Sequence, residues 1–175
     1  MPIKSRIRTI ENYPHKGVMF RDITTLFKDP EGLRIVVEEL FDRYKDFEID
    51  KVIGIESRGF IVGTPLAYLL GVGFVPIRKK GKLPFDTIGQ DYDLEYGTDR
   101  VEIHIDSIEK GEKVLIVDDL IATGGTAEAA VRLVQKMKSV IVECCFVIDL
   151  PDLGGKERLE AMGQKVFTQC EFEGE

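Results

Sequence analysis

The sequence predicts an α/β fold in which a mainly parallel central sheet is flanked by helices. Short apolar runs, typical of strands buried on both faces, recur at 51–55, 73–77, 114–117, 141–148 and 165–168. Helical patterns at 60–70, 126–137 and 156–162 alternate with these runs. Such alternation favours parallel strands joined by helical crossovers, and a length of 175 residues suits a single domain.

Two elements lie outside this alternation. Residues 31–44 form a predicted amphipathic helix ahead of the sheet, with apolar side chains at helical spacing: Leu33, Val36, Val37, Leu40, Phe41 and Tyr44. Between 78 and 111 the pattern changes to a loop rich in Gly, Pro and Asp, with short strands around Tyr92 and at 101–105. An insertion of this kind is a candidate lid over a binding site.

Segment 60–77 allows a second interpretation, because its eighteen residues carry no charge and approach the length of a membrane-spanning helix. Four residues that break helices interrupt it: Pro65, Gly71, Gly73 and Pro76. We therefore predict a helix followed by a short strand, as in a buried crossover, rather than a membrane span.

Composition narrows the class of partner. The net charge of −7 and the pI near 5.0 disfavour broad binding to nucleic acids or anionic membranes, so we expect small-molecule partners. The three cysteines show no disulfide or zinc spacing, and the adjacent Cys144 and Cys145 should face opposite sides of a strand. The N-terminal sequence lacks the apolar region of a secretory signal, which together with free thiols predicts a cytoplasmic protein.

The most informative stretch is 114–126, VLIVDDLIATGGT, which runs from an apolar strand through two carboxylates into a Gly-rich turn. It places Asp118 and Asp119 at the carboxyl end of the strand, with Gly124 and Gly125 opening the next helix. Open parallel sheets bind ligands at that end, where free N–H groups and the helix dipole attract phosphate. Carboxylates repel a phosphate but suit ribose hydroxyls or a metal. The pattern predicts a site for a phosphorylated sugar.

Simpler interpretations of the same residues exist. A carboxylate after a strand is often only a cap, and two glycines often make only a tight turn. Other phosphate sites fit poorly, because the chain has no G-x-x-x-x-G-K-[ST] run, and Gly71 and Gly73 are followed by Val75 and Pro76. We therefore exclude the P-loop and the dinucleotide fingerprint.

The stretch 114–126 resembles the phosphoribosyl pyrophosphate signature of type I phosphoribosyltransferases. Four further segments resemble the adenine phosphoribosyltransferase family, in the same order and at similar spacing: YPHKGVMFRDIT at 13–24, GIESRGF at 54–60, RKKGKLP at 78–84 and DLEYGTDRVEIH at 93–104. The resemblance covers nearly the whole chain. It implies a type I phosphoribosyltransferase fold in one domain, 1–175, with a small hood formed mainly by residues 1–30 and a flexible catalytic loop at about 80–105.

This resemblance implies purine salvage, in which adenine and phosphoribosyl pyrophosphate become AMP and pyrophosphate. Magnesium would be bound through the sugar diphosphate, near Asp118, and not in a site held by the protein alone. Family members are usually homodimers, and we expect the same here. Two other functions stay open: transfer to another purine, and a regulator that senses phosphoribosyl pyrophosphate and binds DNA, although the chain has no spare helix-turn-helix.

The resemblance also assigns substrate contacts. It implies that the sugar 5′-phosphate binds to a loop composed of Ala122, Thr123, Gly124, Gly125 and Thr126. It also implies that Asp118 and Asp119 contact the ribose hydroxyls. The departing diphosphate of phosphoribosyl pyrophosphate needs cations to neutralise its charge. The resemblance assigns three basic residues to this substrate: Arg58, Arg78 and Lys82. A basic run is usually a solvated loop, so the neighbouring Lys79 and Lys80 stay unassigned.

Two further groups are implied by resemblance. Glu95 and Tyr96 match the mobile catalytic loop, where Glu95 is a proposed proton shuttle and closure excludes water, although a lone loop glutamate is usually a surface residue. The adenine pocket would use Val18, Met19, Phe20 and Arg21. A hydrophobic staple entering the turn at 22–27 explains that apolar run nearly as well.

Glu102, His104 and Asp106 alternate along a predicted strand and suggest a metal or acid-base cluster. We favour a half-exposed strand, which gives the same alternation, and we assign no role to His104. With two histidines and poor cysteine spacing, we expect no zinc site held by the protein.

Overall fold

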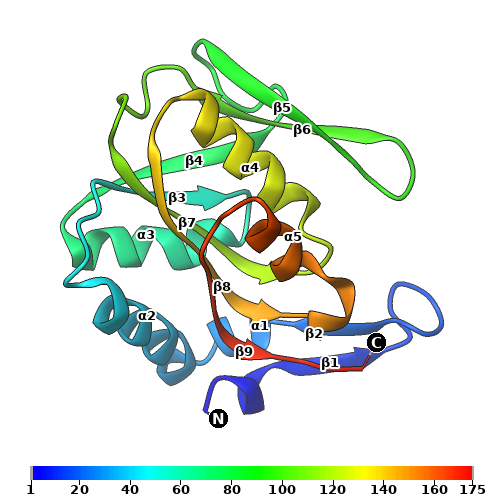
Figure 1. The fold of residues 1–175 in the computed structure, drawn as a ribbon. Helices are drawn as coiled ribbons and strands as arrows, with labels where there is room; N and C mark the ends of the chain where they lie inside the picture. Colours follow the sequence, from blue (N-terminus) through cyan, green and yellow to red (C-terminus); the bar gives the residue numbers. More distant parts are fainter. Residues whose placement is uncertain (1, 175) are drawn as a thin grey trace.

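The computed structural model describes residues 2–174 and confirms an α/β fold with a mainly parallel sheet (Figure 1). The seven-stranded sheet has the order β5-β6-β4-β3-β7-β8-β9. Strands β4, β3, β7, β8 and β9 pair in parallel, and β6 pairs antiparallel with both β4 and β5. Its strands are β3 (Lys51–Ile55), β4 (Gly73–Lys79), β5 (Thr87–Asp93), β6 (Thr98–His104), β7 (Lys113–Ile121), β8 (Val140–Asp149) and β9 (Val166–Glu171). The helices are α1 (Thr24–Phe27), α2 (Pro30–Tyr44), α3 (Gly59–Leu70), α4 (Gly125–Lys136) and α5 (Gly155–Ala161), with short 3-10 turns at Lys4–Arg6 and Pro151–Leu153.

Two hydrophobic clusters lie on the two faces of the sheet. Helices α2 and α3 contribute to one cluster, and α4 and α5 contribute to the other. Along β7, Leu115 belongs to the first cluster and Ile116 to the second. Cys145 and Cys144 divide in the same way along β8, which confirms that the two adjacent thiols face opposite sides.

Strand β7 is longer than the apolar run at 114–117 predicts. It extends to Ile121 because β8 keeps pairing with it, placing Asp118 opposite Phe146 and Ile121 opposite Asp149. Asp118 and Asp119 therefore lie inside the strand, and the expectation that they follow its end is corrected. They still lie in the part of β7 that is nearest to its carboxyl end.

The insertion between β4 and β7 is more regular than the sequence predicts. Strands β5 and β6 have seven residues each and pair from Thr87 opposite His104 to Asp93 opposite Thr98. The hairpin continues the central sheet, because Arg78 of β4 lies opposite Glu102 of β6. In Figure 1 its far end projects beyond the body of the molecule.

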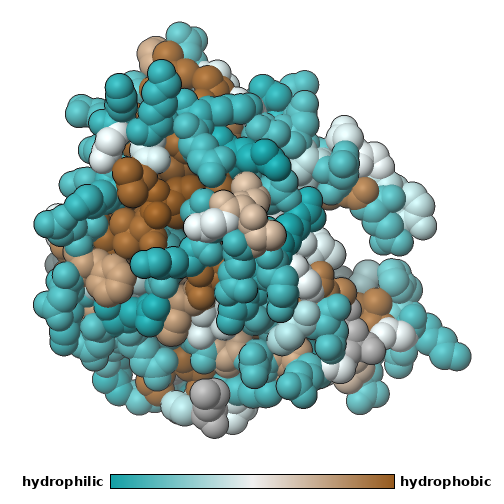
Figure 2. All heavy atoms as spheres, viewed as in Figure 1, coloured by the Kyte–Doolittle hydropathy of each residue, from teal (hydrophilic) through white to brown (hydrophobic). Residues whose placement is uncertain are grey.

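Segment 60–77 forms a helix and a strand, as predicted. Helix α3 ends before Gly71, whose φ of +70° suits glycine, and β4 begins at Gly73. No helix within residues 2–174 combines the length and apolar character needed to cross a membrane. Helix α3 nevertheless exposes Ile61, Tyr68 and Leu69, and Figure 2 shows apolar side chains gathered in this region of the surface.

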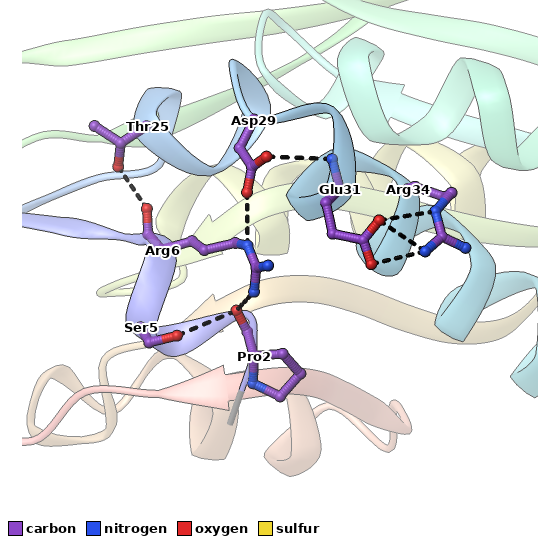
Figure 3. Close-up of polar contacts among 7 residues, drawn as sticks. All are labelled: Pro2, Ser5, Arg6, Thr25, Asp29, Glu31 and Arg34. Atoms are coloured by element: carbon purple, nitrogen blue, oxygen red, sulfur yellow. Dashed lines mark hydrogen bonds and ion pairs between the residues drawn. The ribbon is translucent and has the colours of Figure 1, made fainter.

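The N-terminal residues are tied to α1 and α2 through Arg6 (Figure 3). Its Nε donates to Asp29 Oδ2 at 2.6 Å, and its carbonyl accepts from the Thr25 hydroxyl at 2.7 Å. Asp29 also caps α2, because its Oδ1 accepts from the backbone N–H of Glu31 at 3.2 Å. These contacts anchor a separate two-stranded sheet, β1 (Arg8–Glu11) with β2 (Met19–Asp22), beside the main body.

Candidate active site

The carboxyl ends of the parallel strands surround a cleft of about 550 Å³. Residues 56–58 after β3, Lys79 at the end of β4, and residues 118–127 from β7 into α4 form most of its wall. Tyr92, Leu94 and Val101 from the β5–β6 hairpin complete it. A cleft in this position is the usual ligand site of an open parallel sheet.

A Gly-rich turn joins β7 to α4 along the cleft. Gly124 has a φ of +81°, a left-handed conformation that glycine adopts without strain. The first hydrogen bond within α4 runs from Glu128 N to Gly124 O at 2.8 Å, so the amides at 124–127 have no acceptor inside the helix. Together with the positive end of the helix dipole, these amides can bind an anion. All five residues at 122–126 that were predicted to hold phosphate line the cleft.

Asp118 and Asp119 form a crowded acidic pair in the same cleft. Asp119 is 4% exposed, and its Oδ2 accepts a hydrogen bond from Arg58 Nε at 2.5 Å. Its backbone N–H donates to Asp118 Oδ1 at 2.9 Å. Burial and the adjacent charge of Asp119 raise the pKa of Asp118 well above its ordinary value. Within residues 2–174, Arg58 is the only cation in an ion pair with either carboxylate.

Arg58 reaches this pair because α3 begins very close to β7. A Cβ at Gly59 would lie 2.8 Å from the carbonyl oxygen of Val117 and 3.0 Å from Asp118 Oδ1. Only glycine therefore permits the observed approach of the helix start to the strand. The prediction that Arg58 lies near the substrate site agrees with this placement.

The basic run that begins at the end of β4 is divided between the cleft and its outer side. Lys79 lines the cleft, with its Nζ 2.9 Å from Asp99 Oδ2. Arg78 and Lys82 do not line it; the Arg78 Nε lies 3.4 Å from Glu56 Oε2, and its Nη1 donates to the Lys82 carbonyl at 3.4 Å. Burial acts to raise the pKa of Glu56, but hydrogen bonds from the Lys79 N–H and from Arg78 outweigh it and lower that pKa. The cleft thus contains Lys79, one of the two lysines that the sequence left unassigned.

Glu95 and Tyr96 lie at the tip of the β5–β6 hairpin and do not line the cleft. The turn is closed by the Leu94 N–H, which donates to the Gly97 carbonyl at 2.9 Å, and Gly97 has a φ of +84°. Tyr96 is 86% exposed. A catalytic contact of either residue therefore requires the hairpin to move toward the carboxylates.

The four residues predicted for the base pocket lie on or next to β2 and are also outside the cleft: Val18, Met19, Phe20 and Arg21. The Phe20 ring packs edge-on against Tyr13 with the centroids 5.1 Å apart. Arg21 points toward the C-terminal residues, where its guanidinium lies 4.6 Å from the ring centroid of Phe172. It also donates to the Thr9 hydroxyl at 2.6 Å.

Besides Lys79, sequence reasoning missed three polar side chains of the cleft wall, Glu56, Ser57 and Tyr92. Tyr92 donates through its hydroxyl to Asp99 Oδ2 at 3.1 Å, and the same oxygen accepts from Lys79. Glu56 and Ser57 directly follow a predicted strand, so their position at its carboxyl end was a usable signal. Tyr92 carried no comparable signal, because it looked like any other strand residue.

The alternating acids of β6 do not form a cluster. Glu102 is 9% exposed and accepts from the Gly81 N–H at 3.1 Å, while Asp106 lies beyond the end of the strand. Within residues 2–174, no group of three or more His, Cys, Asp or Glu side chains is arranged to hold a metal ion. Glu102 therefore has a structural role in fixing the turn after β4.

Comparison with known proteins agrees with this geometry. The family model of the phosphoribosyl transferase domain matches residues 22–170. A protein of Nitrosospira multiformis named adenine phosphoribosyltransferase is 69% identical over 99% of both chains, and one of Nitrosomonas europaea with the same name is 63% identical over 99% of both chains.

Solved structures give the same result. The adenine phosphoribosyltransferase of Rhodothermus marinus has a TM-score of 0.89 at 51% identity, covering 97% of this chain and 96% of that one. The Saccharomyces cerevisiae enzyme, complexed with adenine and an imino-altritol bisphosphate, has a TM-score of 0.89 at 39% identity, covering 95% and 96%. The chain therefore belongs to the phosphoribosyltransferase family and, within it, to the adenine phosphoribosyltransferases.

Proposed function

We propose that the cleft is where this protein transfers the phosphoribosyl group of phosphoribosyl pyrophosphate to adenine, giving AMP and pyrophosphate. The observation that carries the proposal is that loop 122–126 and the pair Asp118 and Asp119 line one cleft. Backbone amides suit the 5′-phosphate, and carboxylate oxygens accept hydrogen bonds from ribose hydroxyls. One substrate can therefore be held by its anion and its diol side by side.

The charges around the cleft match the needs of the reaction. Displacing pyrophosphate from the anomeric carbon creates a sugar with oxocarbenium character, which the carboxyl oxygens of Asp118 and Asp119 would stabilise. Arg58 and Lys79 lie on the same wall and would neutralise the departing diphosphate. We assign Arg78 and Lys82, on the outer side, to oxygens at the far end of that group.

Magnesium is assigned to the substrate diphosphate near Asp118. Oxygen is the ligand that magnesium prefers, and the carboxyl group of Asp118 supplies it in the cleft. The bound ion would neutralise part of the diphosphate charge. Removing it with a chelator should abolish turnover, and activity that persisted without any divalent ion would contradict the assignment.

We assign base recognition to Val18, Met19, Phe20 and Arg21, and water exclusion to closure of the hairpin tip that carries Glu95 and Tyr96. A comparison of pH–rate profiles for the wild type and Glu95→Gln tests the proton shuttle. Loss of one limb of the profile in the variant supports it. Unchanged kinetics would remove Glu95 from the mechanism.

We also infer a homodimer located in the cytoplasm. The exposed apolar side chains Ile61, Tyr68 and Leu69 of α3 support a contact between copies. The three buried free cysteines support a reducing compartment. Sedimentation should show a dimer for the wild type and more monomer for Tyr68→Lys. A monomeric wild type would contradict the homodimer. The cytoplasmic location is tested separately by cell fractionation.

A panel of bases tests the function itself. With magnesium and phosphoribosyl pyrophosphate, the purified protein should consume adenine but not hypoxanthine, guanine or orotate. Consumption of another purine in place of adenine would reassign the base pocket. Tight, salt-sensitive DNA binding without turnover would instead identify a regulator.

A further inference from the structure

Helix α5 packs directly against the loop at 122–126, outside the cleft. A Cβ at Gly155 would lie 2.3 Å from the Ala122 carbonyl oxygen and 2.9 Å from Gly124 N. A Cβ at Gly124 would in turn lie 2.9 Å from the Gly155 carbonyl oxygen. The two backbones thus touch with no side chain between them, so the position of the loop depends on the position of α5.

One side chain of α5, Arg158, holds both the loop and the helix that follows it. Its Nη1 donates to the Thr123 carbonyl at 3.3 Å, and its Nε pairs with Glu128 Oε2 in the first turn of α4. The other oxygen of Glu128 accepts from Arg132 Nη2 at 2.8 Å. Hydrogen bonds from Arg132 and Arg158 lower the pKa of Glu128 despite its burial, so this carboxylate stays ionised at neutral pH.

The contact with Thr123 acts on the amide that follows. The Thr123 carbonyl and the Gly124 N–H belong to one peptide group, and a cation bound to the carbonyl polarises that group. Its N–H becomes a stronger hydrogen-bond donor, and Gly124 lines the cleft. Arg158 itself does not line that cleft, so it strengthens an anion site without touching the anion.

We propose that Arg158 is a positioning residue for the 5′-phosphate. From outside the cleft, it holds the loop at 122–126 in place and polarises the peptide group between Thr123 and Gly124. The inference rests on the proposed assignment of the 5′-phosphate to that loop. It goes beyond a structural link between α4 and α5, because such a link would affect all ligands of the cleft equally. Positioning of the loop affects only ligands that carry the sugar phosphate.

Arg132 provides a matched control. It shares the Glu128 carboxylate with Arg158, and the exposed fractions of the two side chains are similar, 50% for Arg132 and 45% for Arg158. Among the residues that the structure describes, the Arg132 side chain donates to Glu128 alone. Replacing Arg132 therefore removes one ion pair of Glu128 and leaves the contact with Thr123 in place.

The experiment measures the affinities of ribose 5-phosphate and inorganic pyrophosphate by calorimetry for the wild type, Arg158→Ala, Arg158→Lys and Arg132→Ala. Binding of both ligands by the wild type tests the proposed function separately. We expect Arg158→Ala to weaken ribose 5-phosphate about tenfold, the scale of one charge-assisted hydrogen bond, while pyrophosphate affinity stays within about twofold. Arg158→Lys should restore part of the loss, and Arg132→Ala should resemble the wild type.

Three results would overturn the inference. One is an unchanged affinity of Arg158→Ala for ribose 5-phosphate. Another is an equal loss for ribose 5-phosphate and pyrophosphate. The third is a loss in Arg132→Ala that matches the loss in Arg158→Ala, because the ion pair with Glu128 would then be the cause.

Discussion

Two clusters around acids on neighbouring strands, Glu143 of β8 with its partners and Asp118 with Asp119 in β7, differ in how completely their carboxylates are hydrogen-bonded. In β8, Glu143 is 5% exposed and accepts hydrogen bonds from Arg43 Nε and Nη2, both at 2.9 Å, and from the Tyr44 hydroxyl at 2.6 Å. The Arg43 guanidinium in turn stacks on Phe167 at 3.8 Å from the ring centroid. Both carboxylate oxygens have strong donors, which compensates for their burial.

In β7, Arg58 is the only cation of the described residues that pairs with Asp118 or Asp119, and Asp118 Oδ1 accepts from the Asp119 N–H. Adjacent like charges in a buried place cost stability, and such arrangements persist where function requires them. The difference teaches that burial of an acid does not by itself indicate its role. The fully bonded cluster stabilises the fold, and the poorly neutralised one is available to a ligand.

The largest effect should come from Asp119→Ala. We expect kcat/KM to fall about 10²–10³-fold, the range for removing one group that stabilises charge in the transition state. The melting temperature should change little, because the substitution also removes a like-charge neighbour of Asp118. Asp106→Asn, which removes an exposed acid far from the cleft wall, is the control. Wild-type kinetics in Asp119→Ala would contradict the assignment of the β7 acids to ligand binding.

Glu143→Ala tests the claim that the β8 cluster stabilises the fold. Removing this partner leaves Arg43 partly buried without its counter-charge, so we expect urea denaturation to show a loss of about 3 kcal/mol in the free energy of unfolding. The estimate takes the low end of the range because the Arg43 side chain is 34% exposed. The kcat of the folded protein should be retained. Lost activity with unchanged stability would reverse our assignment of this cluster.

Asp118→Asn should give the smallest effect, with the opposite sign. The pKa of Asp118 is raised in the folded protein, so folding takes up a proton between the unfolded and folded pKa values, and stability falls as pH rises through that window. In Asp118→Asn, the free energy of unfolding should not show this decrease with rising pH. We expect it to be more stable at neutral pH by on the order of 1 kcal/mol and equal to the wild type below the unfolded pKa. Thermal unfolding across pH, with Asp106→Asn beside it, measures the difference; identical slopes for both variants would contradict it.

The sequence was sufficient to predict the parallel part of the sheet and the proximity of Asp118 and Asp119 to the loop at 122–126. Buried strands and amphipathic helices leave strong periodic signals, as at 51–55 and 126–137. The acidic pair and the Gly-rich turn lie within a few residues of one such apolar run in the sequence, so their proximity needed no knowledge of distant contacts.

The remaining features depend on pairing between segments that are far apart in the chain. The end of β7 is set by β8, and the order of Arg78 and Lys79 around the cleft is set where β6 pairs with β4. Arg158 lies on a short helix whose contact with the 122–126 loop has no periodic signal. Neither its role nor the partners of Arg21 could be read from local patterns.

Those partners of Arg21 have a consequence for how the protein is made. Arg21 Nη2 bonds to the carbonyls of Glu173 and Gly174, and Lys4 Nζ lies 4.8 Å from the Phe172 ring centroid. At about 5–20 residues per second, a ribosome needs roughly 8–30 s to add the 152 residues that follow Arg21 up to and including Glu173. The β1–β2 hairpin is therefore without these partners through most of translation, and it acquires them only after residues 172–174 have emerged.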